Sequence, residues 1–243
     1  MVDLELDGSL AVLTIDRPHA RNAIGPATMD RLDKALDAVV EAGDTTHALV
    51  IKGAGDKAFV SGGDLKELAA IRTESAAMDM ALRMRGICDR IAAFPGPVIA
   101  ALNGHAFGGG AEFALAADIR VAADDIRIAF NQVALAIMPA WGGAERLAAL
   151  VGPGRALLLA GTGQVLDAHE AERVGLVDRV LPRASFEEGW RELARGLAHR
   201  PAREIKHVMK PGGSPREAAR AFARLWVADE HWDAAERVMS RGK

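Results

Sequence analysis

The first part of the chain alternates between short apolar runs and longer segments whose apolar residues recur every three or four positions. Residues 11–16 and 47–52 are short runs rich in aliphatic and β-branched side chains, which predicts two buried strands. Between them, residues 26–41 carry apolar side chains at helical spacing after a proline that suits the first helical turn. Strand, helix and strand in succession are typical of a layered α/β fold.

This alternation continues to about residue 183. Further strands are expected at residues 4–6, 98–102, 118–122, 126–130 and 176–180, and further helices at 64–72, 75–93, 111–117, from 144, 154–160 and 168–173. Beyond Pro182 only helical spacing appears, in segments 185–200, 201–210 and 215–238. We therefore expect an α/β core over residues 1–183 and a C-terminal helical segment over residues 184–243, which packs on the core or on a neighbouring subunit.

Composition and charge narrow the class of partner. Of the 243 residues, 50% are hydrophobic and 26% are charged, which is ordinary for a globular protein and not for a disordered one. The 30 basic and 33 acidic residues give a net charge of −3, so no basic excess indicates nucleic acid or a membrane surface. A small molecule or another protein is the expected partner.

Two further absences in the sequence shape the expectations. The single cysteine, Cys88, has no neighbouring cysteine or histidine at zinc-site spacing, so we expect no metal. The first residues lack the basic start and unbroken apolar stretch of a signal peptide, and no run of about 18 apolar residues occurs. We expect a cytoplasmic protein.

Three glycine-bearing stretches are candidate ligand sites. Residues 53–58 follow a strand, but no helix opens after them, which argues against a nucleotide site. Residues 61–64 and 108–110 each stand directly before a helix, where N–H groups lack intrahelical partners and the helix dipole is positive. Two such ends facing one point would hold an oxyanion, because glycine lets a ligand oxygen approach the backbone. The alternative is two ordinary glycine turns.

Five motifs follow one another along the chain: Arg17-Pro18 with Arg21-Asn22-Ala23, residues 59–66 (FVSGGDLK), 97–104 (PVIAALNG), 107–112 (FGGGAE) and 139–143 (PAWGG). In this order and spacing they resemble the crotonase (enoyl-CoA hydratase/isomerase) superfamily. The resemblance covers nearly the whole chain. It implies a crotonase-like spiral of ββα units with a C-terminal helical segment. It also implies an acyl-CoA thioester as substrate, with coenzyme A part of that substrate and no separate cofactor.

Carried over residue by residue, the resemblance implies an oxyanion hole for the thioester carbonyl, made by the backbone N–H groups of Gly63 and Gly109. Glu112 matches the first of two glutamates that the family uses in hydration. Its apolar neighbours predict a buried carboxylate, whereas the alternative is a solvated one favoured by the helix dipole. The resemblance places four further residues along the coenzyme A moiety, namely Asn22, Ala23, Ser61 and Lys66.

The second family glutamate is missing. Counting back seven positions from the 139–143 loop without gaps puts Gln132 at its place. A neutral amide cannot take or give the proton, which weighs against a strict hydratase. Gln132 would instead orient a water or a substrate oxygen through hydrogen bonds.

One carboxylate suffices for some enolate chemistry, so three functions stay open. The first is an acyl-CoA-processing enzyme of the hydratase/isomerase type, with Glu112 as its acid/base. The second is a decarboxylase of malonyl-type (ethylmalonyl or methylmalonyl) CoA esters, because residues 137–143 are similar to the ethylmalonyl-CoA decarboxylase branch. The third is a non-catalytic acyl-CoA-binding protein. A serine protease of the same fold is set aside, since no matching set of Ser, His and Asp or Lys occurs.

Several aromatic and histidine positions have two interpretations each. Trp141 either walls the acyl pocket or is a core aromatic near a loop. His105 is expected to be a hydrogen-bonded structural residue more than a substrate contact, and Trp226 and Trp232 are expected to be packing groups. The resemblance further implies a homotrimer or dimer of trimers, in which the C-terminal region covers a neighbour's coenzyme A site.

Overall fold

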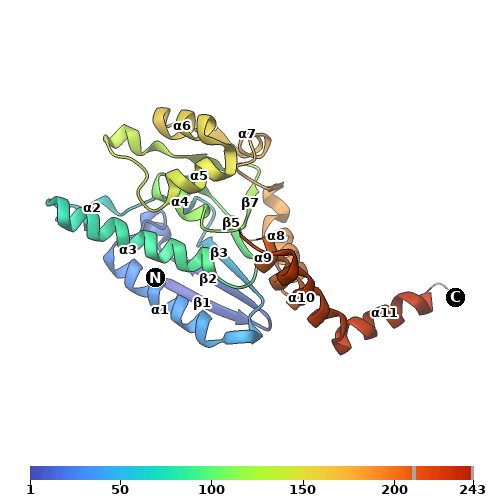
Figure 1. The fold of residues 1–243 in the computed structure, drawn as a ribbon. Helices are drawn as coiled ribbons and strands as arrows, with labels where there is room; N and C mark the ends of the chain where they lie inside the picture. The colour runs from blue at the N-terminus through green and yellow to red at the C-terminus, as the bar shows by residue number, and fades with distance from the viewer. Residues whose placement is uncertain (210–211, 242–243) are drawn as a thin grey trace.

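The computed structural model describes residues 1–209 and 212–241, and its strands form two sheets (Figure 1). The larger sheet has the order β1 (Val2–Asp7), β2 (Leu10–Ile15), β3 (Ala48–Gly53), β5 (Val98–Leu102), β7 (Ile119–Ala123) and β10 (Arg179–Leu181). The smaller has the order β4 (Ala58–Val60), β6 (His105–Phe107), β8 (Arg127–Ala129) and β9 (Leu166–Asp167). Among the described strands, the pairs β1–β2 and β8–β9 are antiparallel and the other pairs are parallel.

The two sheets are built by one repeated unit. Strands β3, β5 and β7 of the larger sheet are each followed by a short strand of the smaller sheet, β4, β6 or β8, and then by helical structure. The first two units continue into α2 (Leu65–Leu68) and α4 (Gly109–Ala114), and the third into the 3-10 helix η3 (Asn131–Leu135). The expected spiral of ββα units is confirmed.

The core lies on both sides of the larger sheet. Every residue of β5 is buried, as expected for a parallel strand covered on two faces. Helix α1 (Pro26–Glu41) packs on β1 and on α3 (Glu74–Ala93), and α8 (Phe186–Leu197) packs on β3 and β7. In Figure 1 these helices lie on opposite sides of the strands. Helices α5 (Gly143–Val151), α6 (Pro153–Thr162) and α7 (Ala168–Arg173) complete the core.

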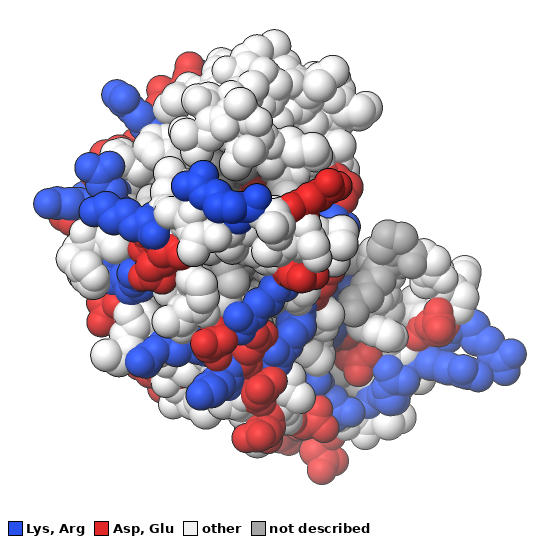
Figure 2. All heavy atoms as spheres, turned by 90° about the vertical axis from the view of Figure 1, so that its left-hand side faces the viewer, with Lys and Arg blue, Asp and Glu red and all other residues white. Residues whose placement is uncertain are grey.

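Surface ion pairs join α1 to α3. Arg83 contacts Asp30 at 2.5 Å, and Arg90 contacts Asp37 at 2.5 Å. Figure 2 shows the side of the molecule that lies on the left in Figure 1. Basic and acidic side chains alternate over the lower part of that side, and its top carries little charge. Such exposed pairs each contribute about 0–1 kcal/mol, so burial rather than charge holds these helices on the sheet.

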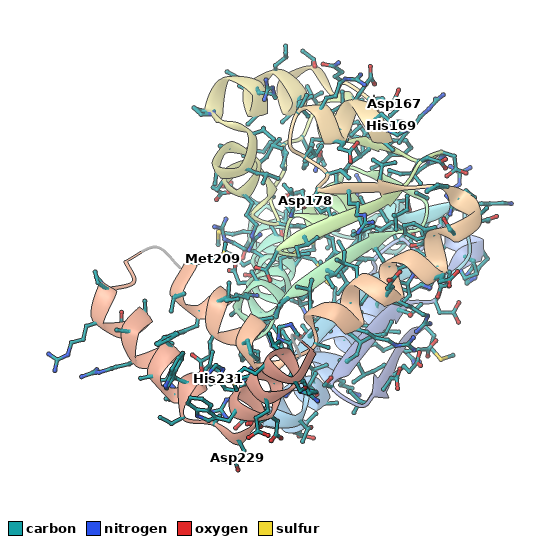
Figure 3. The ribbon with its side chains drawn as sticks, turned by 90° about the vertical axis from the view of Figure 1, so that its right-hand side faces the viewer. Asp167, His169, Asp178, Met209, Asp229 and His231 are labelled. Atoms are coloured by element: carbon teal, nitrogen blue, oxygen red, sulfur yellow. The ribbon has the colours of Figure 1, made fainter. Side chains whose placement is uncertain are left out.

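The last three helices form what we name the C-terminal arm: α9 (Arg200–Met209), α10 (Pro215–Trp226) and α11 (Asp229–Arg241). Helix α9 is attached to the core by ion pairs from Arg203 to Asp44 and from Lys206 to Asp118, and α10 and α11 follow it. Figure 3 shows Asp229 and His231, where α10 meets α11, well away from Asp178 and His169 of the core. The expected helical segment 215–238 consists of α10 and most of α11. Residues 210–211 and 242–243, which belong to the expected segment 184–243, lie outside the described residues.

Three expectations about local structure were wrong. The helix expected at 64–72 is only α2, because Asp64 caps its start and Thr73 caps the start of α3, which leaves a turn between them. The strand expected at 176–180 begins later, at Arg179, because the N–H groups of Leu176 and Val177 donate to Ala171 at the end of α7.

The third error is an omission: no strand was expected at residues 105–107, and they form β6. This strand pairs with β4 and β8, which lie far from it in the sequence. Local periodicity carries no signal for so short a strand, because its hydrogen-bond partners supply its stability.

Candidate active site

Pairing of β4 with β6 brings the two glycine loops together. The loop after β4 contains Gly62 and Gly63; after β6, Gly108 forms the loop and Gly109 is the first residue of α4. A Cβ atom at Gly62 would lie only 3.2 Å from the Gly109 nitrogen, so the loops are in contact. Gly62 and Gly108 have backbone φ angles of 101° and 54°, which residues other than glycine rarely adopt.

The first loop is held by a short bridge to Ile24. Ile24 N–H donates to the Gly62 oxygen, and Asp64 N–H donates to the Ile24 oxygen. The N–H of Gly63 lies on the other side of this bridged backbone. Within residues 1–209 and 212–241, no protein oxygen accepts a hydrogen bond from the N–H of Gly63 or Gly109. The N–H groups of Gly63 and Gly109, on adjacent segments, are therefore both available to a ligand.

Glu112 lies in α4 and is buried, with 2% of its surface exposed. Its Oε1 accepts hydrogen bonds from Gln132 Nε2 at 2.7 Å and from the Ala140 N–H at 3.3 Å. Its Oε2 accepts from the Trp141 N–H at 2.7 Å and from the Gly143 N–H at 2.9 Å. Four donors occupy the four lone-pair positions of one carboxylate. The 139–143 loop thus folds around Glu112 as an anion-binding nest.

Burial raises the pKa of Glu112 above the ordinary glutamate value of 4.5, while the hydrogen bonds from Trp141, Gly143, Gln132 and Ala140 act against that rise. The carboxyl therefore holds its proton at a higher pH than a solvent-exposed glutamate. A displaced pKa beside two free backbone donors is typical of a proton-transfer group.

Gln132 stands directly beside Glu112. It lies in η3 and is 6% exposed. Because an ionised carboxylate only accepts hydrogen bonds, the amide NH₂ faces Glu112 and the amide oxygen is directed elsewhere. In the described part of the chain, that buried Oε1 has no donor.

Trp141 lies against both glycine loops. A Cβ at Gly109 would lie 2.4 Å from Cζ3 of the indole, and one at Gly63 would lie 3.8 Å from Cζ2. A Cβ at Gly63 would also come within 2.9 Å of a Leu68 methyl group. The side chain is 6% exposed. An indole and an aliphatic side chain therefore border the two glycines.

The residues assigned to coenzyme A divide into two groups. Asn22 is fully buried; its Nδ2 donates to the Ala54 and Ala58 oxygens, and its Oδ1 accepts from the Arg17 N–H. Its side chain is thus used inside the protein, and a direct contact with a ligand is not what the structure shows. The other three assigned residues share one surface groove of about 700 Å³ with Gly63, namely Ala23, Ser61 and Lys66.

The same groove also contains Arg17 and Arg21, two arginines of the first motif to which the sequence analysis gave no role. Arg17 is neutralised by Asp64 at 3.1 Å and Glu67 at 2.6 Å. Among the described residues, Arg21 and Lys66 of the groove wall form no ion pair, so they leave positive charge there. Arg21 belongs to the Arg21-Asn22-Ala23 motif, so its positive charge next to Asn22 and Ala23 could have been recognised from the sequence as a candidate phosphate contact.

Two other positions have structural roles. His105 accepts a hydrogen bond from the Arg127 N–H at Nδ1 and stacks on Phe107, with ring centroids 5.6 Å apart, as expected for a hydrogen-bonded structural histidine. Arg146 was missed by sequence reasoning, although its Nη1 donates to the Trp141 oxygen at 3.0 Å. No motif marks it, because its partner is a backbone oxygen.

The described residues lack two further kinds of feature, a metal-binding cluster and a membrane-spanning helix. No group of three or more His, Cys, Asp or Glu side chains in the described ranges is arranged to hold a metal. No helix formed by the described residues is both long enough and apolar enough to cross a bilayer.

Comparison with known proteins identifies the relatives of this chain. Residues 5–222 match the enoyl-CoA hydratase/isomerase family. A short-chain-enoyl-CoA hydratase of Clostridium acetobutylicum is 37% identical over 81% of this chain and 74% of its own length. A crotonyl-CoA hydratase of Syntrophomonas wolfei is 41% identical over 73% of this chain and 68% of its own length.

Solved structures agree. The crystal structure of an enoyl-CoA hydratase from Bacillus anthracis superposes with a TM-score of 0.90 at 29% identity, covering 99% of this chain and 96% of that one. Similarity in sequence and fold thus extends over nearly the whole chain, with the glycine loops and Glu112 inside the matched region. The chain belongs to the enoyl-CoA hydratase/isomerase family of the crotonase superfamily and is an acyl-CoA-processing enzyme of that type.

Proposed function

We propose that the enzyme stabilises the enolate of an acyl-CoA thioester with the N–H groups of Gly63 and Gly109, while Glu112 moves the proton. Two observations support this proposal. Neither N–H group donates to another group of the described protein, and the two backbone segments that carry them are in contact. A preorganised donor to a developing oxyanion contributes about 3 kcal/mol to transition-state stabilisation. Two donors and one buried carboxylate are sufficient parts for enolate chemistry.

Oε1 of Glu112 is the atom we assign to proton transfer. Oε2 is held by two short N–H bonds, of 2.7 and 2.9 Å. Oε1 accepts its second bond from Ala140 at 3.3 Å, which is long and therefore weak. Release of that one N–H frees a lone pair on Oε1 and leaves the rest of the nest intact.

The observation that favours isomerisation over hydration is the 2.7 Å contact between Glu112 and Gln132. Isomerisation of a 3-enoyl thioester needs one group, which takes a proton from C2 and returns it to C4. The C2–H electron pair enters the dienolate, whose charge rests on the thioester oxygen between the two glycines. Hydration needs a second proton-transfer group to activate water, and the neutral amide of Gln132 cannot serve.

The raised pKa of Glu112 favours a second candidate, decarboxylation of a malonyl-type thioester. Loss of carbon dioxide leaves its bonding electron pair on C2 as the enolate. A protonated Glu112 would then deliver its proton to C2. The same two N–H groups serve this reaction, so the candidates differ only in the starting protonation state of one carboxyl.

The coenzyme A part of the substrate fits the 700 Å³ groove that reaches Gly63. Coenzyme A carries phosphate groups, and the unpaired Arg21 and Lys66 of the groove wall complement that negative charge. Ser61 contributes a hydroxyl to the same wall. The cations Arg21 and Lys66 offset part of the negative charge of the phosphates.

The experiment is a panel of enoyl-, 3-enoyl- and malonyl-type CoA esters assayed as a function of pH. If Glu112 begins as a base, kcat/KM for a 3-enoyl-CoA falls as pH decreases through the raised pKa. If it begins as an acid, decarboxylation falls as pH increases through that pKa. A protein that binds these esters and converts none of them is the non-catalytic acyl-CoA binder, and that result would overturn the proposal.

A further inference from the structure

We propose that Trp141 limits the acyl group to short chains, and that Arg146 is the positioning residue that keeps its indole in place. The inference rests on the proposed function, because it takes the thioester carbonyl to lie between Gly63 and Gly109. It gives the limit on acyl-chain length a structural cause, and it adds Arg146, a residue that the family resemblance does not supply.

The position of the indole is the first observation. Three of its carbons, Cζ3, Cη2 and Cε3, lie 2.4–2.9 Å from where a Gly109 Cβ would be, so the ring edge rests on the bare Cα. Cζ2 of the same ring reaches toward Gly63. A carbonyl oxygen that accepts both N–H groups lies next to these glycines. The acyl carbons beyond it therefore begin within reach of the indole and of Leu68.

The second observation is that the backbone of Trp141 is held on both sides. Its N–H donates to Glu112 Oε2 at 2.7 Å, and its oxygen accepts from Arg146 Nη1 at 3.0 Å. Arg146, in α5, also pairs with Asp89 of α3. Gly142 has a φ angle of 85°, and a Cβ there would lie 2.3 Å from Arg146 Nη1, so the guanidinium uses space that only glycine leaves free.

A tryptophan side chain has two rotatable bonds, so a fixed backbone leaves few positions for its ring. Moving the indole away from Gly109 by shifting the loop would break the bonds to Glu112 and Arg146 together. The ring is therefore a rigid wall, and an acyl chain that grows toward it meets a steric limit. Short acyl groups fit in front of this wall and long ones do not.

The test measures binding of two saturated thioesters, butanoyl-CoA and decanoyl-CoA, by calorimetry. The unmutated enzyme should bind butanoyl-CoA at least as tightly as decanoyl-CoA. Trp141→Ala should shift the ratio of the two dissociation constants toward decanoyl-CoA by tenfold or more, because each newly buried methylene is worth roughly fourfold in affinity. Trp141→Phe, which keeps an aromatic ring, should shift it less.

Met138→Ala is the matched control, because Met138 directly precedes the 139–143 loop that contains Trp141 and is 69% exposed. The ratio of the two dissociation constants in Met138→Ala should equal that of the unmutated enzyme. A folded Trp141→Ala protein with an unchanged ratio would overturn the inference. Failure of the unmutated enzyme to bind either thioester would instead overturn the proposed function, so the two failures are distinguishable.

Arg146 is tested by the same ratio. Arg146→Met removes the donor to Trp141 and should move the ratio in the direction of Trp141→Ala by a smaller factor, and Arg146→Lys should restore part of the selectivity. Arg85→Met is the control, because Arg85 also links α3 to α5, through Glu145 at 2.6 Å, without contacting Trp141. If Arg146→Met lowers only the melting temperature, as Arg85→Met would, Arg146 has no positioning role.

Discussion

Glu112 is the residue on which the chemistry depends, and its replacement separates binding from turnover. Glu112→Gln keeps the size of the side chain but removes the acid/base, so kcat should fall by roughly 10²-fold or more. The dissociation constant for an acyl-CoA should stay nearly unchanged, because the groove and both glycine donors remain. Glu145→Gln, an exposed glutamate of α5 paired with Arg85, is the control and should leave kcat unchanged. A fall of less than tenfold in Glu112→Gln would contradict the assignment.

Gln132 is the residue that separates this site from a two-carboxylate site. Gln132→Glu would place a second carboxylate 2.7 Å from Glu112, and one of the two must then hold a proton at neutral pH. We expect crotonyl-CoA hydration, followed by loss of enone absorbance, to rise above a low starting level. Asn131→Asp, at the adjacent residue, should have no such effect. Hydration by the unmutated enzyme near 10 s⁻¹ or above would show that the two-carboxylate requirement is wrong.

At the scale of elements, the contact between α4 and β4 holds the glycine loops in register. Gly110 of α4 lies so close to β4 that a Cβ there would be 1.7 Å from the Val60 oxygen. Gly110→Ala must therefore displace backbone, and we expect it to lower the free energy of unfolding by about 3 kcal/mol. Gly86, within α3, has no atom within 4 Å of its Cβ position. Gly86→Ala should raise stability by about 0.5–1 kcal/mol, and chemical denaturation of both variants checks the opposite signs.

At the scale of the whole molecule, the C-terminal arm presents more apolar surface than a monomer normally leaves in water. Exposed large side chains follow α10 and α11, including Phe222, Trp226, Trp232 and Val238. Trp226 and Trp232 contact each other, with ring centroids 5.7 Å apart, so they pack together while staying partly exposed. We therefore predict a trimer or a dimer of trimers, in which cyclic symmetry lets each arm use the same surface of its neighbour.

Light scattering at micromolar concentration measures this directly, and a monomeric mass would count against it. Val238→Glu, at a position of α11 that is 72% exposed, should reduce the mass because it puts a charge into the contact. Val40→Glu, on α1 and 70% exposed, should not. Equal effects of the two substitutions would show that added charge, and not the arm, governs assembly.

The sequence by itself determined the features that depend on local pattern. The spacing of apolar residues was sufficient to predict α1, α3, β3 and β5. The buried side chains of an amphipathic helix or a buried strand recur at short, regular intervals in the sequence. Glycine loops before two helices were visible for the same reason. The apolar residues beside Glu112 also predicted its burial correctly.

Only the tertiary structure decided what surrounds the reacting groups. Glu112 meets its Trp141 and Gly143 donors 29 and 31 residues further along the chain, and Asn22 meets Ala58 at a separation of 36 residues. Such contacts depend on the pairing of β4 with β6 and on where the 139–143 loop folds back. No local pattern encodes them, because a backbone N–H or oxygen forms its hydrogen bond without using the side chain of its residue.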